Sequence, residues 1–170
     1  GIFFNKVLDL VKISPNDLIV EVASNDGTIL KPFVSAGFSV LGVEPAKNIV
    51  KIAESQGVRT VCSYWNRETA KNIVKSHGFA KVIIARNVIP HVSDLSEVMA
   101  GIHDALDESG TGIIEFHYGG VIQQDLHYDS IYHEHLCYFT VKSMSELLGR
   151  YGFYPFHIDH SPISGGSLVI

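Results

Sequence analysis

The segment DSIYHEHLCYF, residues 129–139, gathers side chains that can transfer protons. It places Tyr132, Glu134 and His135 close together, and His91 follows a separate apolar run. A histidine, with a pKa of about 6.5, is a natural base near neutral pH, and an enolate oxygen needs hydrogen-bond donors. The segment can supply both functions, which suits removal of a proton from a carbon atom beside a ketone.

The same segment raises the alternative of a metal site. His133, Glu134 and His135 offer potential zinc ligands. However, the sequence has neither an HExxH motif nor a set of four cysteines and histidines at zinc spacing, so we expect no metal. Side chains alternate in direction along an extended segment. We therefore expect His133 to point away from its neighbours and to have a structural role.

A second polar segment, VEVASNDGTIL at 20–30, is typical of a strand, a tight turn and a helix. A dinucleotide site would need GxGxxG here, and only Gly27 is present, which disfavours NAD. Glu21 and the polar turn 24–26 suit a cationic ligand instead, such as an ammonium or a sulfonium group. The turn residues could equally cap the following helix.

Glu44 ends the next apolar run. An acidic side chain at this position can bind both hydroxyl groups of a ribose, although a solvated glutamate is an equal alternative. Together, the acidic turn and Glu44 indicate S-adenosylmethionine (SAM) as the ligand.

Apolar runs alternate with helical patterns along the chain. The predicted strands are 17–23, 38–44, 58–62, 81–86 and 111–118, and the predicted helices between them are 28–36, 45–56, 66–77 and 94–107. After an irregular stretch to residue 139, a helix at 141–151 and strand-like runs at 153–159 and 165–170 follow. This alternation predicts a doubly wound, mostly parallel α/β sheet, Rossmann-like, with its ligands beyond the carboxyl ends of the strands.

The composition predicts one globular domain over residues 1–170. A net charge of −5 without a basic run argues against nucleic acid as a partner. The two cysteines stand alone and no apolar run could span a bilayer, so we expect a cytoplasmic protein. The chain starts at Gly1, inside an amphipathic pattern, and ends in an apolar run, which suggests a domain excised from a longer protein. The oligomeric state is not predicted.

Five segments resemble the SAM-dependent sugar C-methyltransferases, which add a branch methyl group to dTDP-linked deoxysugars. They are EVASNDGTIL, VLGVEPAKNIV, ARNVIPH, DSIYHEHLCYF and GGSL, in the family's order and at roughly its spacing, from about residue 18 to the end. The wider superfamily carries an acidic residue followed by GxGxG, whereas here Ala23 and Asn25 occupy the first two glycine positions. The resemblance implies a fold of the class I SAM-dependent methyltransferase type.

The resemblance also implies a set of SAM-binding residues. Glu21, Ala23, Ser24, Asn25 and Gly27 would surround the methionine part, Glu44 would bind the ribose, Trp65 and Asn66 would flank the adenine, and Asn87 would lie near the sulfonium. From the sequence alone, Trp65 could equally be a core aromatic residue.

For catalysis, the resemblance implies His135 as the general base and Tyr132 as donor to the developing oxyanion. Glu134 would orient His135 or bind the sugar, and His91 would be a second polar group in the same pocket. The predicted activity is methyl transfer, through an enolate, to the α-carbon of a nucleotide-linked keto-deoxysugar. The alternatives are an O- or N-methyltransferase acting on another small molecule, or a SAM-binding domain that is inactive without the zinc-binding and Rossmann-like domains that flank it in the family.

Overall fold

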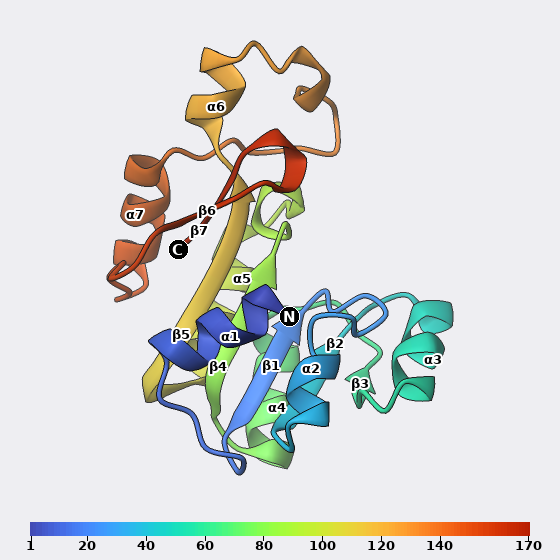
Figure 1. Cartoon of the computed structure of the whole chain (residues 1–170). Coiled ribbons are helices and arrows are strands. Elements are labelled where there is room, and N and C mark those ends of the chain that lie inside the picture. Colours follow the sequence, from blue (N-terminus) through green and yellow to red (C-terminus); the bar gives the residue numbers. More distant parts are fainter.

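Seven strands form one sheet in the structure, a computed structural model that describes residues 1–170. In chain order they are β1 Leu18–Val22, β2 Ser39–Val43, β3 Thr60–Val61, β4 Ala80–Arg86, β5 Leu106–His117, β6 Asp159–Ser161 and β7 Ser167–Val169. Their order across the sheet is β3-β2-β1-β4-β5-β7-β6 (Figure 1). Every residue of β1 is buried, as expected for an apolar strand that is covered on both faces.

The sheet is mostly parallel. The β1 strand pairs in parallel with β2 and β4, β2 with β3, and β4 with β5. Only β7 is antiparallel, to β5 on one side and β6 on the other. The strand order reverses between β1 and β4, so the carboxyl ends of these two strands border the crevice where ligands bind in such sheets. The predicted doubly wound, mostly parallel sheet is therefore confirmed.

Helices cover both faces of the sheet. Their bounds are α1 Ile2–Leu10, α2 Lys31–Ser35, α3 Lys47–Ser55, α4 Arg67–His77, α5 Leu95–Ala105, α6 Gly119–Gln124 and α7 Val141–Arg150. One hydrophobic core joins the sheet to α1, α2 and α3, and a larger one joins it to α4, α5 and α7. In Figure 1, α1 crosses in front of the sheet at β4 and β5. No helix combines the length and the apolar composition that crossing a bilayer requires.

The element boundaries differ from the predicted ones where local hydrogen bonds intervene. The helix predicted from residue 28 begins at Lys31, because the Asp26 carboxylate accepts hydrogen bonds from the backbone N–H (3.1 Å) and the hydroxyl (2.7 Å) of Thr28 and so holds a turn. The predicted helix 94–107 ends at Ala105, and β5 follows at once. The predicted third strand shortens to two residues and the strand-like run at 165–170 to three. The strand-like run predicted at 153–159 was wrong, because residues 153–158 form no strand and β6 starts only at Asp159.

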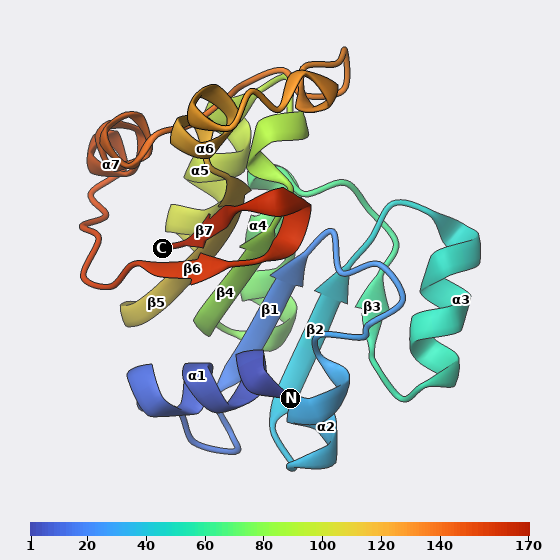
Figure 2. The same cartoon turned by 45° about the horizontal axis from the view of Figure 1, so that its top comes forward.

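The irregular stretch forms a lobe, residues 119–139, beyond the carboxyl end of β5 (orange in Figures 1 and 2). It contains α6 and the short 3-10 helix η2 Tyr128–Ser130. The lobe is closed at its base, because the Gly119 N–H donates to the Phe139 carbonyl at 2.7 Å beside a bridge between Tyr118 and Phe139. The chain thus leaves and rejoins the sheet edge at one place.

Candidate functional site

The turn after β1 has the backbone shape of a glycine-rich turn with only one glycine. Ala23, Asn25 and Gly27 all have a positive φ, at 52°, 51° and 82°. Asparagine adopts this left-handed conformation readily, whereas alanine pays about 1–2 kcal/mol for it. Such strain in a turn at the ligand edge of a sheet is typical of functional sites. Ala23 and Asn25, which replace the first two glycines of the motif, therefore adopt the left-handed conformation that glycine favours.

Gly27 is the position that must lack a side chain. A Cβ atom there would lie 2.8 Å from Cγ2 and 2.9 Å from Cβ of Val58, closer than real contacts allow. The close approach packs the turn against the buried side chain of Val58, which precedes β3.

Glu44 fastens this turn to the end of β2. One carboxylate oxygen accepts from the Asn25 N–H at 3.2 Å and the other from the Ala46 N–H at 2.9 Å. Each oxygen keeps a further lone pair, so these bonds leave room for a ribose hydroxyl. Ser24 is buried against Gly42 of β2, and its Oγ has no hydrogen-bond partner in the protein.

Glu21, at the end of β1, is 4% exposed, and its Oε2 has no hydrogen-bond partner. Burial raises the pKa of Glu21 from 4.5 to about 8; the positive charge of Arg86 opposes this shift, and the negative charge of Asp26 adds to it. At neutral pH the free protein therefore holds Glu21 mainly in its neutral form. A cationic ligand would favour the charged form.

A buried ion pair that the sequence patterns did not predict lies on the same edge. Arg86 at the end of β4 pairs with Glu115 of β5, whose side chain is fully buried. The Phe3 ring of α1 lies 4.7 Å from the guanidinium carbon. The signal for this pair was a charged residue within each of two short, otherwise apolar runs, IIAR and IIEF, because buried charges need partners.

The polar groups of Trp65 and Asn66 are both used by contacts within the protein. Trp65 is buried in the core that contains α4 and α5, and its indole N–H donates to the Val98 carbonyl at 3.2 Å. Asn66 caps α4, where its side chain accepts from the Thr69 N–H at 2.8 Å. These contacts match the core role that the sequence left open for Trp65.

The segment after β4 contacts both β5 and the lobe. Asn87 has a positive φ of 52°, and its N–H donates to the Glu115 carbonyl at 2.8 Å. His91 follows in the short helix η1 Ile89–His91, and its Nδ1 donates to the Glu134 carbonyl at 2.9 Å. One short segment therefore carries a predicted residue of each polar cluster.

Tyr132 and His135 meet across a tight turn. The His135 N–H donates to the Tyr132 carbonyl at 3.0 Å, so residues 132–135 are not extended. The two rings lie 4.2 Å apart, and the Tyr132 hydroxyl is 3.1 Å from Nε2 of His135. The argument from an extended segment for the direction of His133 was wrong for this reason. His133 lies exposed on the turn.

Hydrogen bonds fix the tautomer of His135. Its Nδ1 lies 2.8 Å from the Ser130 carbonyl, which can only accept, so Nδ1 carries the proton in the neutral ring. The lone pair is then on Nε2, facing the Tyr132 hydroxyl. The His91 ring packs 4.7 Å from the His135 ring. The Ser130 carbonyl thus orients His135, while the exposed Glu134 carboxylate has no protein partner.

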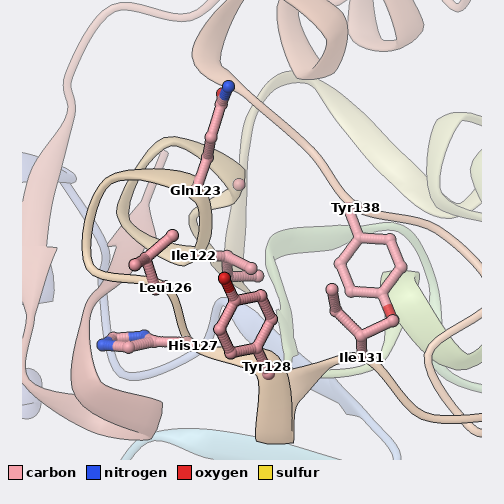
Figure 3. Close-up of a pocket in the computed structure, with 8 residues that line it drawn as sticks. Ile122, Gln123, Leu126, His127, Tyr128, Ile131 and Tyr138 are labelled. Carbon is pink, nitrogen blue, oxygen red and sulfur yellow. The ribbon is translucent and has the colours of Figure 1, made fainter.

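A hollow of about 320 Å³ lies within the lobe. Figure 3 shows Leu126 and His127 on one side of it and Ile131 and Tyr138 on the other. The Tyr138 hydroxyl donates to the same Ser130 carbonyl, at 3.3 Å, that holds His135. The hollow therefore shares a wall with the Tyr132–His135 pair.

His117, at the end of β5, is buried with neither ring nitrogen bonded. Burial, followed by the neighbouring His127 and His135, lowers the pKa of His117, against a smaller opposing effect of Asp129. Burial beneath the lobe therefore favours the neutral form of His117. No group of three or more His, Cys, Asp or Glu side chains in the structure is arranged to hold a metal ion.

Comparison with known proteins places the chain in a family. A family model described as a methyltransferase domain matches residues 4–158. A C-methyltransferase from Streptomyces niveus, NovU, is 31% identical over 169 residues, which are 97% of this chain and 40% of that protein. The chain thus spans about two fifths of the length of this relative.

Solved structures share the fold. A SAM-dependent methyltransferase from Archaeoglobus fulgidus superposes with a TM-score of 0.76 at 14% identity, covering 94% of this chain and 70% of that one. Magnesium protoporphyrin IX methyltransferase from Synechocystis PCC 6803, with bound S-adenosylhomocysteine, gives a TM-score of 0.70 at 14% identity, covering 91% and 73%. The fold class predicted from the sequence is confirmed.

Proposed function

Because the chain belongs to the methyltransferase-domain family, we propose that it binds SAM and transfers the methyl group to a carbon atom of a small molecule. The main support for transfer to carbon, and not to oxygen or nitrogen, is the Tyr132–His135 pair. It holds a base and a hydroxyl donor together, with Nε2 of His135 3.1 Å from the Tyr132 hydroxyl. The name of the Streptomyces niveus relative, a C-methyltransferase, supports the same choice.

The donor site comprises the turn after β1 and the ends of β2 and β4. Glu21 and the turn Ala23, Ser24, Asn25 and Gly27 hold the methionine part of SAM, Glu44 holds the ribose, and Asn87 lies near the sulfonium. Support comes from the partnerless Glu21 and Ser24 oxygens and from the left-handed backbone at Ala23, Asn25 and Asn87. Trp65 and Asn66 have no contact with the ligand in this proposal, because the core and α4 use their polar groups.

His135 and Tyr132 carry the acceptor chemistry. Nε2 of His135 takes the proton from a carbon beside a ketone, and the electrons of that C–H bond form an enolate. The Tyr132 hydroxyl donates to the enolate oxygen, and His91, packed against His135, is a second polar group of the same pocket. The enolate carbon then attacks the methyl group, and the electrons of the broken carbon–sulfur bond stay on sulfur to give S-adenosylhomocysteine. Substrate must first draw the Tyr132 hydroxyl away from Nε2.

The acceptor that we propose is a nucleotide-linked keto-deoxysugar, because the YHEH segment and the turn at 23–27 resemble those of the sugar C-methyltransferases. Glu134, exposed and free of protein partners, would bind sugar hydroxyls. The Streptomyces niveus relative is a longer protein, of which the match covers 40%. Turnover by residues 1–170 alone is therefore part of the proposal. We also infer a cytoplasmic location from the two lone cysteines, which are free thiols in the structure.

The test pairs His135→Ala with His133→Ala, a matched control on the same turn. His135→Ala should keep SAM binding, measured by titration calorimetry, and lose methyl transfer by a factor of about 10²–10⁴, the contribution of a general base. It should also stop deuterium exchange at the acceptor's α-carbon in D₂O. His133→Ala should leave SAM binding, methyl transfer and deuterium exchange unchanged. Methyl transfer that survives in His135→Ala would refute the assignment of the base.

Tyr132→Phe separates carbon from heteroatom transfer. Loss of the hydroxyl should slow methylation by about 10²-fold or more if an enolate forms. An oxygen or nitrogen nucleophile needs no enolate stabilisation, so a nearly normal rate without α-deuterium exchange would establish the O- or N-methyltransferase alternative instead.

A further inference from the structure

Two buried carboxyl groups share one arginine on the α1 face of the sheet. Glu21, Arg86 and Glu115 each lie two residues after an isoleucine of the core beneath α1. These isoleucines are Ile19, Ile84 and Ile113. Side chains two residues apart in a strand lie on the same face, so the three charged residues project from the face that α1 covers. The isoleucines belong to the core that α1 covers (Figure 1). Both glutamates are at least nine-tenths buried.

The strand register decides which carboxylate the arginine reaches. Arg86 lies directly opposite Glu115 across the β4–β5 pair. Glu21 lies opposite Ile84, so Arg86 is its diagonal neighbour, with Cα atoms about 8 Å apart from the spacing of strands and residues. The guanidinium pairs with Glu115, and Phe3 covers it at 4.7 Å. No ion pair joins Arg86 to Glu21.

Glu21 therefore lacks a cation in the free protein. A buried carboxylate without a partner is costly, so the group stays protonated. The charged groups that act on Glu21 are Arg86 from β4 and Asp26 from the turn. The α1 helix presents the apolar Phe3, while its Lys6 pairs with Asp159 of β6.

We propose that Glu115 is a positioning residue that keeps Arg86 away from Glu21, so that the cationic methionine end of SAM becomes the counter-ion of Glu21 and binding of SAM releases the Glu21 proton. This inference rests on the SAM binding proposed above. It adds that donor binding and proton release are one coupled event, in which the Arg86–Glu115 ion pair takes part by holding Arg86.

Titration calorimetry with SAM, in two buffers of different ionisation enthalpy at pH 7, counts the released protons. Wild-type protein should release about one proton per SAM, and Glu21→Gln should release none. In Glu115→Gln, Arg86 is free to pair with Glu21, so proton release should fall below about 0.3 and affinity should fall by about tenfold or more. The double variant Glu115→Gln/Arg86→Met removes the competing cation and should restore the release of about one proton.

A damaged fold could not produce loss in the single variant and recovery in the double variant. Should Glu115→Gln fail to fold, the wild-type protein still provides a test, because release of one proton makes the SAM association constant rise about tenfold per pH unit between pH 6 and pH 7.5. SAM binding without proton release, or unchanged release in Glu115→Gln, would overturn the inference but not the proposed function. Wild-type protein that does not bind SAM would overturn both.

Discussion

Replacing Glu21 with glutamine should remove a large pH dependence from the stability of the free protein. In the folded state, burial raises the pKa of Glu21 from 4.5 to about 8. Between these two values the folded state holds a proton that the unfolded state has lost. The stabilisation of the folded state by the Glu21 proton is therefore complete below pH 4.5 and is lost as the pH rises through about 8.

The magnitude follows from the two pKa values. The rise from 4.5 to about 8, at about 1.4 kcal/mol per pH unit, corresponds to at most about 5 kcal/mol in the free energy of unfolding. Urea unfolding without SAM between pH 5 and pH 8 should show wild type losing about 4 kcal/mol relative to Glu21→Gln over this range. His117 has a lowered pKa and contributes with the opposite sign, but it does so in both proteins and cancels in the difference.

The control is Glu54→Gln, a change at an exposed glutamate of α3, which should keep the wild-type pH dependence. Parallel stability curves for wild type and Glu21→Gln would refute the reasoning. They would mean that Glu21 is already ionised in the folded protein, and Arg86 would then have to divide its charge between two carboxylates.

Two further changes test the turn and the core. Ala23→Gly should raise the free energy of unfolding by about 0.5–1 kcal/mol, because glycine relieves the left-handed strain at the cost of a more flexible unfolded chain; a lower thermal midpoint would contradict this. Trp65→Phe should lower the free energy of unfolding by about 1–3 kcal/mol, through loss of the hydrogen bond to Val98 and of packing, and should leave the SAM dissociation constant within about twofold; a tenfold loss of affinity would instead restore Trp65 to the adenine site.

The sequence predicted the sheet well because its strands are recognisable locally. Apolar runs such as LIVEV in β1 form strands wherever helices cover both faces, and the polar turn after this run lies at the carboxyl edge as expected. The unusual residues in that turn were also visible in the sequence. Their left-handed backbone was not, because Ala23 gives no local sign of it.

The details that sequence patterns missed depend on contacts between distant segments. Arg86 and Glu115 become partners only through the register of β4 against β5. The direction of Trp65 is set by packing against α5. At 132–135, the segment carries no glycine or proline to indicate a turn, so the sequence predicted an extended backbone where the structure has a turn.

The hydrogen bond between Gly119 and Phe139 makes the lobe structurally independent of the sheet. Because this bond closes the lobe at its root, residues can be exchanged or added within it without moving the register of β5 or the start of α7. Closing a longer loop costs little, since each doubling of its length adds only about 0.6 kcal/mol. Under the proposed function, divergence in the acceptor can therefore proceed in this lobe, while the turn after β1 that we propose for the methyl donor stays unchanged.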